Sequence, residues 1–447
     1  MRDIHRMPLP HRRRGLAMVA STCVIGSMLA ACTVGGSSAS GSADKGTLNI
    51  AMWTNPPAVD FVKKLDAEFE KQHPGVKVEL KTAPTANNGW GTLFNSLLSA
   101  KSVDVLADYP RMPGAWPPPS TGIAAGSWNG MITSGQLTDL SKQPFMKNYD
   151  PALERAAMGY NGGVYGVLAA AYSHGVWYKK DLLAKYHLQV PTTFNEYLND
   201  LKTFKSHGIT PIFVAGKDDL QGAEYSSCVQ QSLMKGQSPA QAADVGKQRA
   251  QAFWNGSQSW SDAIYQTCAQ QYVQAMKYVE PAATGVSQLT APGVWAAKAD
   301  DFPFLEDGSW DGSTIAQANP KLKFGFFVPP GTNDAATNRN IISPDLTWEI
   351  PTWTKHKSLA LDWLKLFSTQ TNYQKWLQAT GSVSIQPGQA AHGLPWMDWL
   401  NANQANAFAS LQGPWIPTGA ATDAAGPDLT KMVPFGHQAV KAALTSA

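Results

Sequence analysis

The segment from residue 47 to residue 107 alternates strand patterns with helix patterns. Thr47–Met52 is typical of a buried strand, Val59–Gln72 repeats apolar residues at helical spacing, and Val76–Leu80 is typical of a second strand. A helix from about Gly91 to Ala100 and a third buried strand over Ser102–Ala107 follow. This β-α-β-α-β order predicts an α/β fold with a mostly parallel sheet that helices cover on both faces.

The ends of these strands indicate where a ligand would bind. In open α/β sheets, ligands lie beyond the carboxyl ends of the strands. Two such ends fall at Trp53–Asn55 and Asp108–Arg111. Further along, two strand-like runs flank the small residues 169–171, and this pattern is typical of a crossing between two domains.

Size and charge limit the classes of protein that the chain can be. With 447 residues, 43% hydrophobic and 15% charged, it is long enough for two globular domains. The net charge of +3 includes +4 from residues 1–31, which leaves −1 for the rest. A nearly neutral body has no long-range field to hold nucleic acid, so we expect no nucleic-acid partner.

The chain begins with a basic segment and then an uncharged one. Arg12, Arg13 and Arg14 precede Gly15–Ala31, which carries no charge and ends in small residues. These are the parts of an export signal, and the uncharged run is marginal in length for a membrane span. We therefore expect residues 1–31 to be a signal peptide. The arginine run leaves the twin-arginine route open beside the general secretory route.

The end of this segment indicates a lipid anchor. Leu29-Ala30-Ala31-Cys32 resembles the bacterial lipoprotein signal, in which the cysteine becomes the lipidated N-terminus. Cleavage there would leave Cys32 as the anchor and residues 32–46, rich in Gly and Ser, as a flexible tether. We expect an extracytoplasmic protein that lipid alone holds on the outer face of the bacterial cytoplasmic membrane. An ordinary signal peptide with an incidental cysteine is the alternative.

Two further cysteines, Cys228 and Cys268, lie in stretches that we predict to be helical. Outside the cytoplasm such a pair can oxidise. Closing a loop of this length would stabilise the protein by roughly 4 kcal/mol in the chain-entropy model, less any strain. We predict a structural disulfide between them, and two free thiols are the alternative.

An acidic turn carries a tryptophan among small and polar neighbours. The run Glu306–Gly312 reads EDGSWDG, with Trp310 followed by Asp311. Glycine and aspartate favour a loop, and loops often carry binding groups because their polar backbone stays near water. A flat apolar ring beside a carboxyl fits a ligand with an apolar face and a hydroxylated rim, as in a sugar. A tryptophan that closes the edge of a core is the alternative.

The sequence carries none of the common catalytic patterns. A glycoside hydrolase needs two carboxyls that face one bond, but the nearest candidates, Asp307 or Glu306 with Asp311, lie on one loop. The sequence has no G-x-S-x-G elbow, no HExxH pair, no Cys/His cluster with zinc spacing and no phosphate-binding glycine loop. We therefore expect no enzyme activity, no cofactor and no metal.

Ten short segments follow one another in a familiar order: MWTNP, FEKQHPGVKVE, VDVLADYPR, GQLTDL, VYGVLAAAYSHGVWYKKDLL, PTTFNEYLNDLKTFKSHGITPI, EDGSWDG, FGFFVPPG, TWEIPTWTKHKSLALDWLKLFST and GSVSIQPG. Together they resemble the extracellular solute-binding proteins of bacterial ABC importers, specifically the large sugar-binding family 1. The resemblance runs from Thr47 to about Pro387. It departs from the family at the long insertion 111–134, at AAKADDFPFLED, and at Asp345–Trp348, where many members carry a double glycine.

The resemblance implies a two-lobed fold. Each lobe would be a mostly parallel sheet flanked by helices, and the chain would cross between the lobes three times. Residues 47–168 and 349–388 would form the N-terminal lobe, and residues 169–348 and 389–447 the C-terminal lobe. The ligand would bind in the cleft between the lobes and draw them together by hinge motion.

The resemblance also implies a set of ligand-binding positions. Carried over one by one, they are Trp53, Asn55, Asp108, Tyr109, Arg111, Tyr172, Trp310, Asp311, Trp348, Glu349 and Ser382. Other roles stay open for several of them. Asp108 and Arg111 could form a surface ion pair, Tyr172 could pack at the hinge, and either Trp53 or Trp348 could be a core residue.

The function that the resemblance implies is that of a lipid-anchored substrate-binding protein of an ABC sugar importer. It would be a monomer that binds a mono- or oligosaccharide and delivers it to permease subunits served by a separate ATPase. A receptor for a polyamine or a peptide is the alternative, since Asp108, Asp311 and Glu349 are acids that a polyamine would need. A secreted glycoside hydrolase is a further alternative.

Overall fold

The structure is a computed structural model that describes residues 45–85, 88–108, 128–151, 154, 158–160, 162–218, 222–411, 429, 432 and 439–445. The expected signal peptide, Cys32 and the tether up to residue 44 lie outside the described residues, as do Tyr109 and Arg111. No helix in the described ranges combines the length and the hydropathy that crossing a membrane requires.

The predicted β-α-β-α-β segment forms three strands of a five-stranded sheet. In spatial order the strands are β2 (Val76–Ala83), β1 (Gly46–Trp53), β3 (Val105–Asp108), β13 (Thr347–Glu349) and β6 (Val167–Leu168). Strand β1 is parallel to β2 and β3, whereas β13 is antiparallel to β3 and to β6. Because β1 and β3 are parallel, Trp53 and Asp108 end their strands at the same edge of the sheet.

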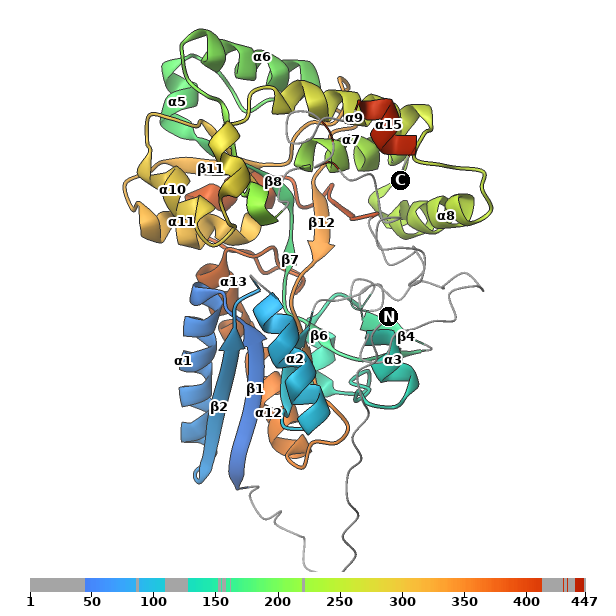
Figure 1. Ribbon diagram of the computed structural model, residues 1–447. Helices are drawn as coiled ribbons and strands as arrows, with labels where there is room; N and C mark the ends of the chain where they lie inside the picture. Colours follow the sequence, from blue (N-terminus) through green and yellow to red (C-terminus); the bar gives the residue numbers. More distant parts are fainter. Residues whose placement is uncertain are drawn as a thin grey trace, which may run out of the picture. The chain divides into compact units, whose positions relative to one another are not determined.

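Helix α1 (Pro56–Gln72) joins β1 to β2, and α2 (Gly89–Ala100) joins β2 to β3 (Figure 1). Helix α1 begins at Pro56 because Asn55 caps it: the Asn55 side-chain oxygen accepts a hydrogen bond from the backbone N–H of Ala58 at 3.2 Å. Helix α1 packs against α12 (Lys357–Phe367) and α13 (Gln370–Thr380), while α2 contacts β1 and β2.

A second sheet has four strands. Their spatial order is β11 (Phe324–Phe327), β8 (His174–Lys179), β10 (Phe304–Gly308) and β9 (Ile212–Val214). Strand β8 is antiparallel to both β10 and β11, and only the β9–β10 pair of this sheet is parallel.

The expectation of mostly parallel sheets is therefore wrong for the second sheet, and the first sheet is mixed. Crossover helices force parallel pairing only on the strands that they connect. Strands β6, β8 and β13 instead follow or precede the segments that run between the two sheets. Their direction is free of that rule, and each pairs in antiparallel fashion.

The remaining helices are mostly short. They are α3 (Trp128–Thr133), α5 (Lys180–Lys185), α6 (Phe194–Ser206), α7 (Ala223–Leu233), α8 (Ala242–Trp254), α9 (Ala263–Met276), α10 (Ala291–Ala297), α11 (Gly312–Ala318), α14 (Asp398–Ala402) and α15 (Val440–Thr445). Helix α6 starts with the capping box that its sequence indicates. Thr193 Oγ1 accepts the N–H of Glu196 at 3.3 Å, and the Glu196 carboxylate accepts the N–H of Thr193 at 3.1 Å.

Three segments of the chain meet where the sheets connect. Strand β7 (Ala171–Tyr172) pairs antiparallel with β12 (Ile341–Pro344) (Figure 1). Strand β12 in turn pairs with β14 (Phe408–Ala409). Ala171 also exchanges two backbone hydrogen bonds with Val383, at 2.9 and 3.0 Å. Each passage of the chain is thereby fixed to another by backbone hydrogen bonds, and we refer to residues 168–172, 343–347 and 383 as the crossing segments.

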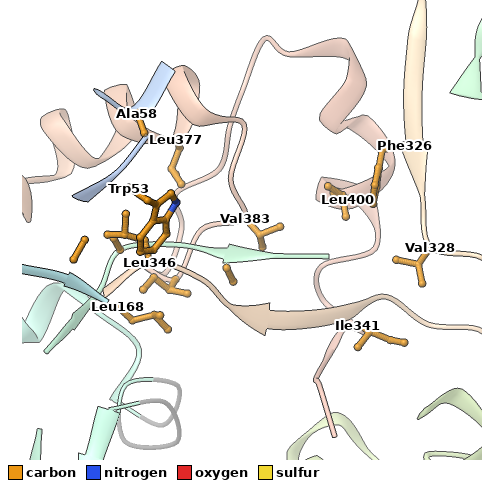
Figure 2. Packing of buried hydrophobic residues seen from close by; sticks show 14 of the residues in the cluster. Trp53, Ala58, Leu168, Phe326, Val328, Ile341, Leu346, Leu377, Val383 and Leu400 are labelled. Atoms are coloured by element: carbon orange, nitrogen blue, oxygen red, sulfur yellow. The ribbon is translucent and has the colours of Figure 1, made fainter. Parts of the chain in front are cut away.

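Apolar packing continues from the first sheet into the crossing segments. Trp53 at the end of β1 belongs to the same apolar cluster as Leu346, Leu377 and Val383 (Figure 2). Deeper in the first sheet, the fully buried Trp348 contacts Trp363 of α12 edge to face, with ring centroids 5.1 Å apart.

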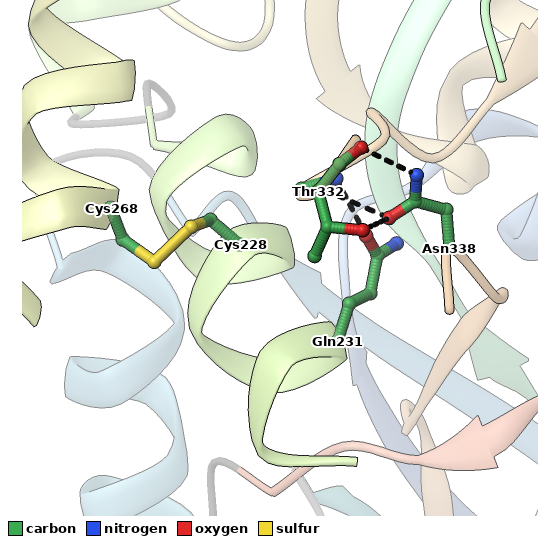
Figure 3. Close-up of a disulfide and its surroundings, with 6 residues drawn as sticks. Cys228, Gln231, Cys268, Thr332 and Asn338 are labelled. Atoms are coloured by element: carbon green, nitrogen blue, oxygen red, sulfur yellow. Dashed lines mark hydrogen bonds between the residues drawn. A yellow bond between two sulfur atoms is a disulfide. The ribbon is translucent and has the colours of Figure 1, made fainter. Parts of the chain in front are cut away.

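The predicted disulfide between Cys228 of α7 and Cys268 of α9 is present, with the two Cα atoms 5.4 Å apart (Figure 3). It joins two helices that also pack on each other. Gly331 passes so close to α7 that a Cβ there would lie 2.3 Å from the Cα of Cys228. The side chain of Gln231 accepts the N–H of Gly331 at 2.6 Å and donates to the carbonyl of Arg339 at 3.1 Å. Helix α7 therefore holds the loop that leads into β12.

A buried acid joins α1 to α12. Asp66 accepts a hydrogen bond from the indole N–H of Trp363 at 2.8 Å, and burial raises its pKa to about 7. A carboxyl whose pKa is raised by folding is more stable protonated in the folded state. Its contribution to stability is present below its unfolded pKa near 4 and is lost as the pH rises through 7.

We expect the Asp66→Asn variant to be more stable than the wild type at pH 8 and nearly equal to it at pH 4, close to the unfolded pKa. The amide keeps the acceptor for Trp363 but carries no charge to desolvate, which should be worth roughly 2 kcal/mol or more at pH 8. Urea denaturation at both pH values measures this difference. Asp60→Asn, at an exposed position on the same helix, is the control. A loss of stability at pH 8 in the Asp66 variant would contradict the expectation.

Candidate functional site

The absence of a side chain at Gly308 leaves room for the indole of Trp310. Gly308 is the last residue of β10, and Trp310 follows in the 3₁₀ turn Ser309–Asp311. The six-membered ring of the indole lies on the Cα of Gly308, where a Cβ would come within 2.2 Å of three ring atoms. Any side chain at position 308 would therefore displace the ring. The indole of Trp177 donates a hydrogen bond to the carbonyl of Gly308 at 3.0 Å and fixes this backbone from behind.

Two more rings surround the half-buried indole. Tyr172 of β7 meets it edge to face, with centroids 4.9 Å apart and planes at 70°. His174 at the start of β8 lies nearly parallel to it, at 11° and 6.4 Å. His174 comes to this position because it pairs with Gly308 across the β8–β10 ladder. Three elements thus place three aromatic rings together beside the crossing segments.

A buried polar network supports these rings. The N–H of Ser173 donates to Ser309 Oγ at 3.1 Å, and the N–H of Ser309 donates to the carbonyl of Ser173 at 2.9 Å. Ser173 Oγ donates to the side-chain oxygen of Asn340 at 2.8 Å. These bonds join the residues next to Tyr172 and Trp310, so the two rings share one rigid backbone frame.

The titratable rings are uncharged near neutral pH. Burial lowers the pKa of His174 to about 4, so its imidazole is neutral. Burial, and then the charge of Asp345, raise the pKa of Tyr172 to about 12, so its phenol stays protonated. The phenol, the imidazole and the indole together form a neutral aromatic surface.

Two interacting carboxyls, Asp307 and Asp311, flank the turn that carries Trp310. Asp311 follows Trp310 directly, and burial raises its pKa to about 7. Asp307 is fully buried, and burial followed by the charge of Asp311 holds its pKa well above the usual range. Asp307 also accepts the backbone N–H of Gly308 at 2.7 Å. Burial therefore favours the protonated form of both acids, and that of Asp307 more strongly.

Asp345 is a member of this group that we did not predict. It lies between β12 and β13, and its backbone N–H donates to the carbonyl of Ala170 at 3.0 Å. Its side chain is half-buried, and burial raises its pKa to about 7. Because Asp345 lies two residues beyond Ser343, the partner of Tyr172, strand alternation places its side chain on the same face of the ladder as the Tyr172 ring.

The structure brings together only some of the predicted residues. Tyr172, Trp310 and Asp311 form one group, as described above. Trp53 is 8% exposed and packs edge to face on Trp90 of α2 at 6.0 Å. Asn55 uses its side chain to cap α1. Asp108 is 6% exposed, and its carbonyl accepts the hydroxyl of Thr347 at 3.0 Å. Ser382 is buried, and its hydroxyl donates to Thr380 Oγ1 at 2.8 Å.

Two of the predicted positions lie in the core. Trp348 and Glu349 are both fully buried in β13, and Trp348 packs on Trp363 and Phe367. Trp348 is a core residue, which is the alternative role that the sequence left open for it. Neither side chain has surface for a ligand, because β13 is an interior strand between β3 and β6 and its residues have neighbours on both faces.

The signals for the residues that we missed are weak in the sequence. His174 joins the site through strand register, and Gly308 through the fold-back of an indole two residues later. Asp345 stood out in the sequence only as part of the run Asp345–Trp348, which departs from the family pattern. Within the described part of the chain, no group of three or more His, Cys, Asp or Glu side chains is placed to hold a metal ion.

The chain matches a known protein family over most of its length. The model for the bacterial extracellular solute-binding protein matches residues 55–374. The chain belongs to this family. The resemblance that the sequence motifs indicated is thereby confirmed.

Relatives with assigned names support this membership. The melibiose/raffinose/stachyose-binding protein MelE of Bacillus subtilis is 24% identical over 275 residues, which span 61% of this chain and 58% of MelE. The multiple sugar-binding protein of Streptococcus mutans is 26% identical over 330 residues, which span 72% of this chain and 71% of the relative. The match thus spans less than two thirds of the length of MelE.

Solved structures show the fold. RafE in complex with raffinose has a TM-score of 0.67 at 19% identity and covers 90% of this chain and 98% of its own. The apo-form of RafE from Streptococcus pneumoniae has the same TM-score at 20% identity, covering 91% of this chain and 98% of its own. The predicted two-lobed α/β fold of the solute-binding proteins is therefore confirmed.

We expect the Gly308→Ala substitution to displace the indole of Trp310 from its position on residue 308. The added methyl would occupy space that the indole fills, so the ring must tilt away from Tyr172, at a cost of roughly 1 to 3 kcal/mol. Near-UV circular dichroism should report the loss of Tyr172–Trp310 coupling, and urea denaturation should report the destabilisation. Gly285→Ala is the matched control, since a Cβ there meets nothing within 4 Å. Unchanged spectra in the Gly308 variant would show that the indole of Trp310 does not pack on residue 308.

Proposed function

We propose that this solute-binding protein is the substrate receptor of an ABC sugar importer. It captures an oligosaccharide outside the cytoplasmic membrane and delivers it to permease subunits that a separate ATPase serves. Membership of the solute-binding family and the sugar-binding names of its relatives support the proposal.

One observation in the structure carries the proposal. A half-buried indole lies on a glycine at the crossing segments, with a phenol against its edge and the carboxyl of Asp311 next to it. The axial C–H groups of a pyranose form an apolar patch that covers such a ring, and both surfaces lose water on contact. A carboxylate that keeps exposed surface beside such a ring accepts hydrogen bonds from the hydroxyls at the rim of the sugar.

The names of the relatives favour one class of sugar. MelE is named for melibiose, raffinose and stachyose, and RafE is solved with raffinose. These three sugars share a terminal α-linked galactose on a chain of different length. We propose an α-galactoside of two to four rings as the ligand class.

The remaining features of the receptor follow from the same proposal. Cys32 carries the lipid that holds the protein on the outer face of the membrane, and residues 32–46 form the tether. The ligand contacts residues of both lobes in the cleft between them and so favours a closed state. The protein acts as a monomer.

The burial and position of particular acids argue against a polyamine receptor and a glycoside hydrolase, two of the alternatives that the sequence left open. A polyamine would need several accessible acids, but Glu349 is fully buried and Asp108 nearly so. A glycoside hydrolase would need two carboxyls on opposite sides of a bond, but Asp307 at the end of β10 and Asp311 in the turn that follows interact with each other.

Titration calorimetry of the whole protein tests the proposed class. The panel contains melibiose, raffinose and stachyose, with maltotriose, spermidine and a tripeptide as comparison ligands. We expect saturable binding of at least one α-galactoside and weaker or no binding of spermidine and the peptide. Tight binding of spermidine alone would overturn the proposal. Release of free galactose in the calorimeter sample would support the hydrolase instead.

We expect Trp310→Ala to lose about 1 kcal/mol or more of binding free energy for the ligand that binds best, because the stacking surface is removed. Trp310→Phe should recover part of the loss, since it keeps a flat ring on Gly308. Trp399→Ala, which removes a half-buried indole from α14, is the control and should bind as the wild type does. Equal affinities of the Ala variant and the wild type would show that the ligand does not stack on this ring.

A further inference from the structure

Asp345 is held rigidly by its backbone. Its N–H donates to the carbonyl of Ala170, and the carbonyl of the next residue, Leu346, accepts the N–H of Ala169 at 2.7 Å. The β7–β12 ladder pairs Ser343 with Tyr172 just before this point. Both neighbours of Asp345 are therefore fixed to the first crossing segment, and its side chain leaves the backbone in a set direction.

The carboxyl of Asp345 lies beside the aromatic group. Asp345 lies two residues beyond Ser343, which pairs with Tyr172, so the two side chains share one face of the ladder, and the charge of Asp345 contributes to the raised pKa of the Tyr172 phenol. The ring of Tyr172 in turn meets the edge of Trp310. A ligand that covers Trp310 would therefore have its rim near the Asp345 carboxyl.

Asp345 differs from several other buried acids in having no partner for its carboxyl. Asp66 accepts from Trp363, Glu224 accepts from Tyr197 at 2.9 Å, and Glu306 accepts from two backbone N–H groups at the start of α7. Among the residues that the structure describes, no side chain or backbone group bonds to the Asp345 carboxyl, and it takes part in none of their ion pairs. It nevertheless keeps accessible surface.

An acid in this situation is costly for the protein alone. A partly buried carboxylate without hydrogen bonds loses the water that would stabilise its charge. Its pKa is raised to about 7 by burial, with no neighbouring charge as a cause. The cost is removed when a ligand supplies the missing donors.

We propose that Asp345 is a specificity-determining residue whose two carboxylate oxygens accept hydrogen bonds from two neighbouring hydroxyls of the sugar on Trp310. This inference rests on the proposed function and names the feature of the sugar that this site selects. A sugar that lacks one of the two hydroxyls leaves a carboxylate oxygen unpaired and binds more weakly.

The proposal makes binding depend on pH in a defined direction. The ligand requires the ionised carboxylate, and in the free protein this form is lost as the pH falls through about 7. Affinity should therefore rise with pH up to about 7 and level off above it. Between pH 8 and pH 5.5 we expect a loss of affinity of roughly tenfold to thirtyfold, since each unit below the pKa removes at most about tenfold.

The other titratable groups around Asp345 set the controls. Tyr172 on β7 and His174 on β8 keep one protonation state between pH 5.5 and 8, given their pKa values of about 12 and about 4. The Asp307–Asp311 pair lies after β10, and the pKa of Asp311 is also about 7. Glu349 is fully buried in β13. Asp311 is therefore the group that could imitate the pH effect.

The test measures raffinose or stachyose affinity by calorimetry from pH 5.5 to pH 8 for the wild type, Asp345→Asn and Asp311→Asn. We expect the wild type to show the pH dependence. Asp345→Asn should bind about tenfold more weakly at pH 8 and lose most of the dependence, while Asp311→Asn should retain most of it, whatever its affinity at pH 8. A wild-type slope in Asp345→Asn, or its loss only in Asp311→Asn, would overturn the proposal.

A second measurement needs no variant. At pH 6.5, binding should release a fraction of a proton from Asp345, which calorimetry in buffers of different ionisation enthalpy detects. Absence of proton release would contradict the proposal even if Asp345→Asn failed to fold. Absence of sugar binding at every pH would instead contradict the proposed function, so the two failures are distinguishable.

Discussion

The site depends on the antiparallel ladder that Ala171 and Tyr172 form with Ser343 and Pro344. This short pairing holds two passages of the chain together between the sheets, and Val383 of a third passage bonds to Ala171. Tyr172 belongs to the ladder and Asp345 follows it directly, so neither can move without the other. Helix α7 and its disulfide hold the loop that leads into β12, and they support the ladder from the second sheet.

The packing of Trp310 on Gly308 adds the second part of the site to this ladder. The indole lies on Gly308 because the β8–β10 ladder ends there, and the Ser173–Ser309 bonds join that end to the residue after Tyr172. An apolar ring is thereby fixed against groups that cannot carry charge near neutral pH. Around them lie acids whose pKa values burial has raised to about 7, so the protonation of the site changes near neutral pH.

Much of the fold could be predicted because helix and strand periodicity is local. The segments from β1 to β3, the cap of α6 and the pairing of Cys228 with Cys268 were all visible in the sequence. The directions of β8 and β13 were not, because they depend on how the chain passes between the sheets. Within the site, Tyr172, Trp310 and Asp311 could be predicted from family motifs. His174, Gly308 and Asp345 could not, because register and ring packing decide their roles, and the same packing places Trp348 in the core.

The central claim is that a sugar ring rests on Trp310 beside Tyr172 and Asp345. A crystal structure of the protein with the α-galactoside that binds best tests it most directly. The account predicts a pyranose ring parallel to the indole of Trp310, with two adjacent hydroxyls on the carboxylate of Asp345. A sugar bound elsewhere, with Trp310 and Asp345 untouched, would contradict it.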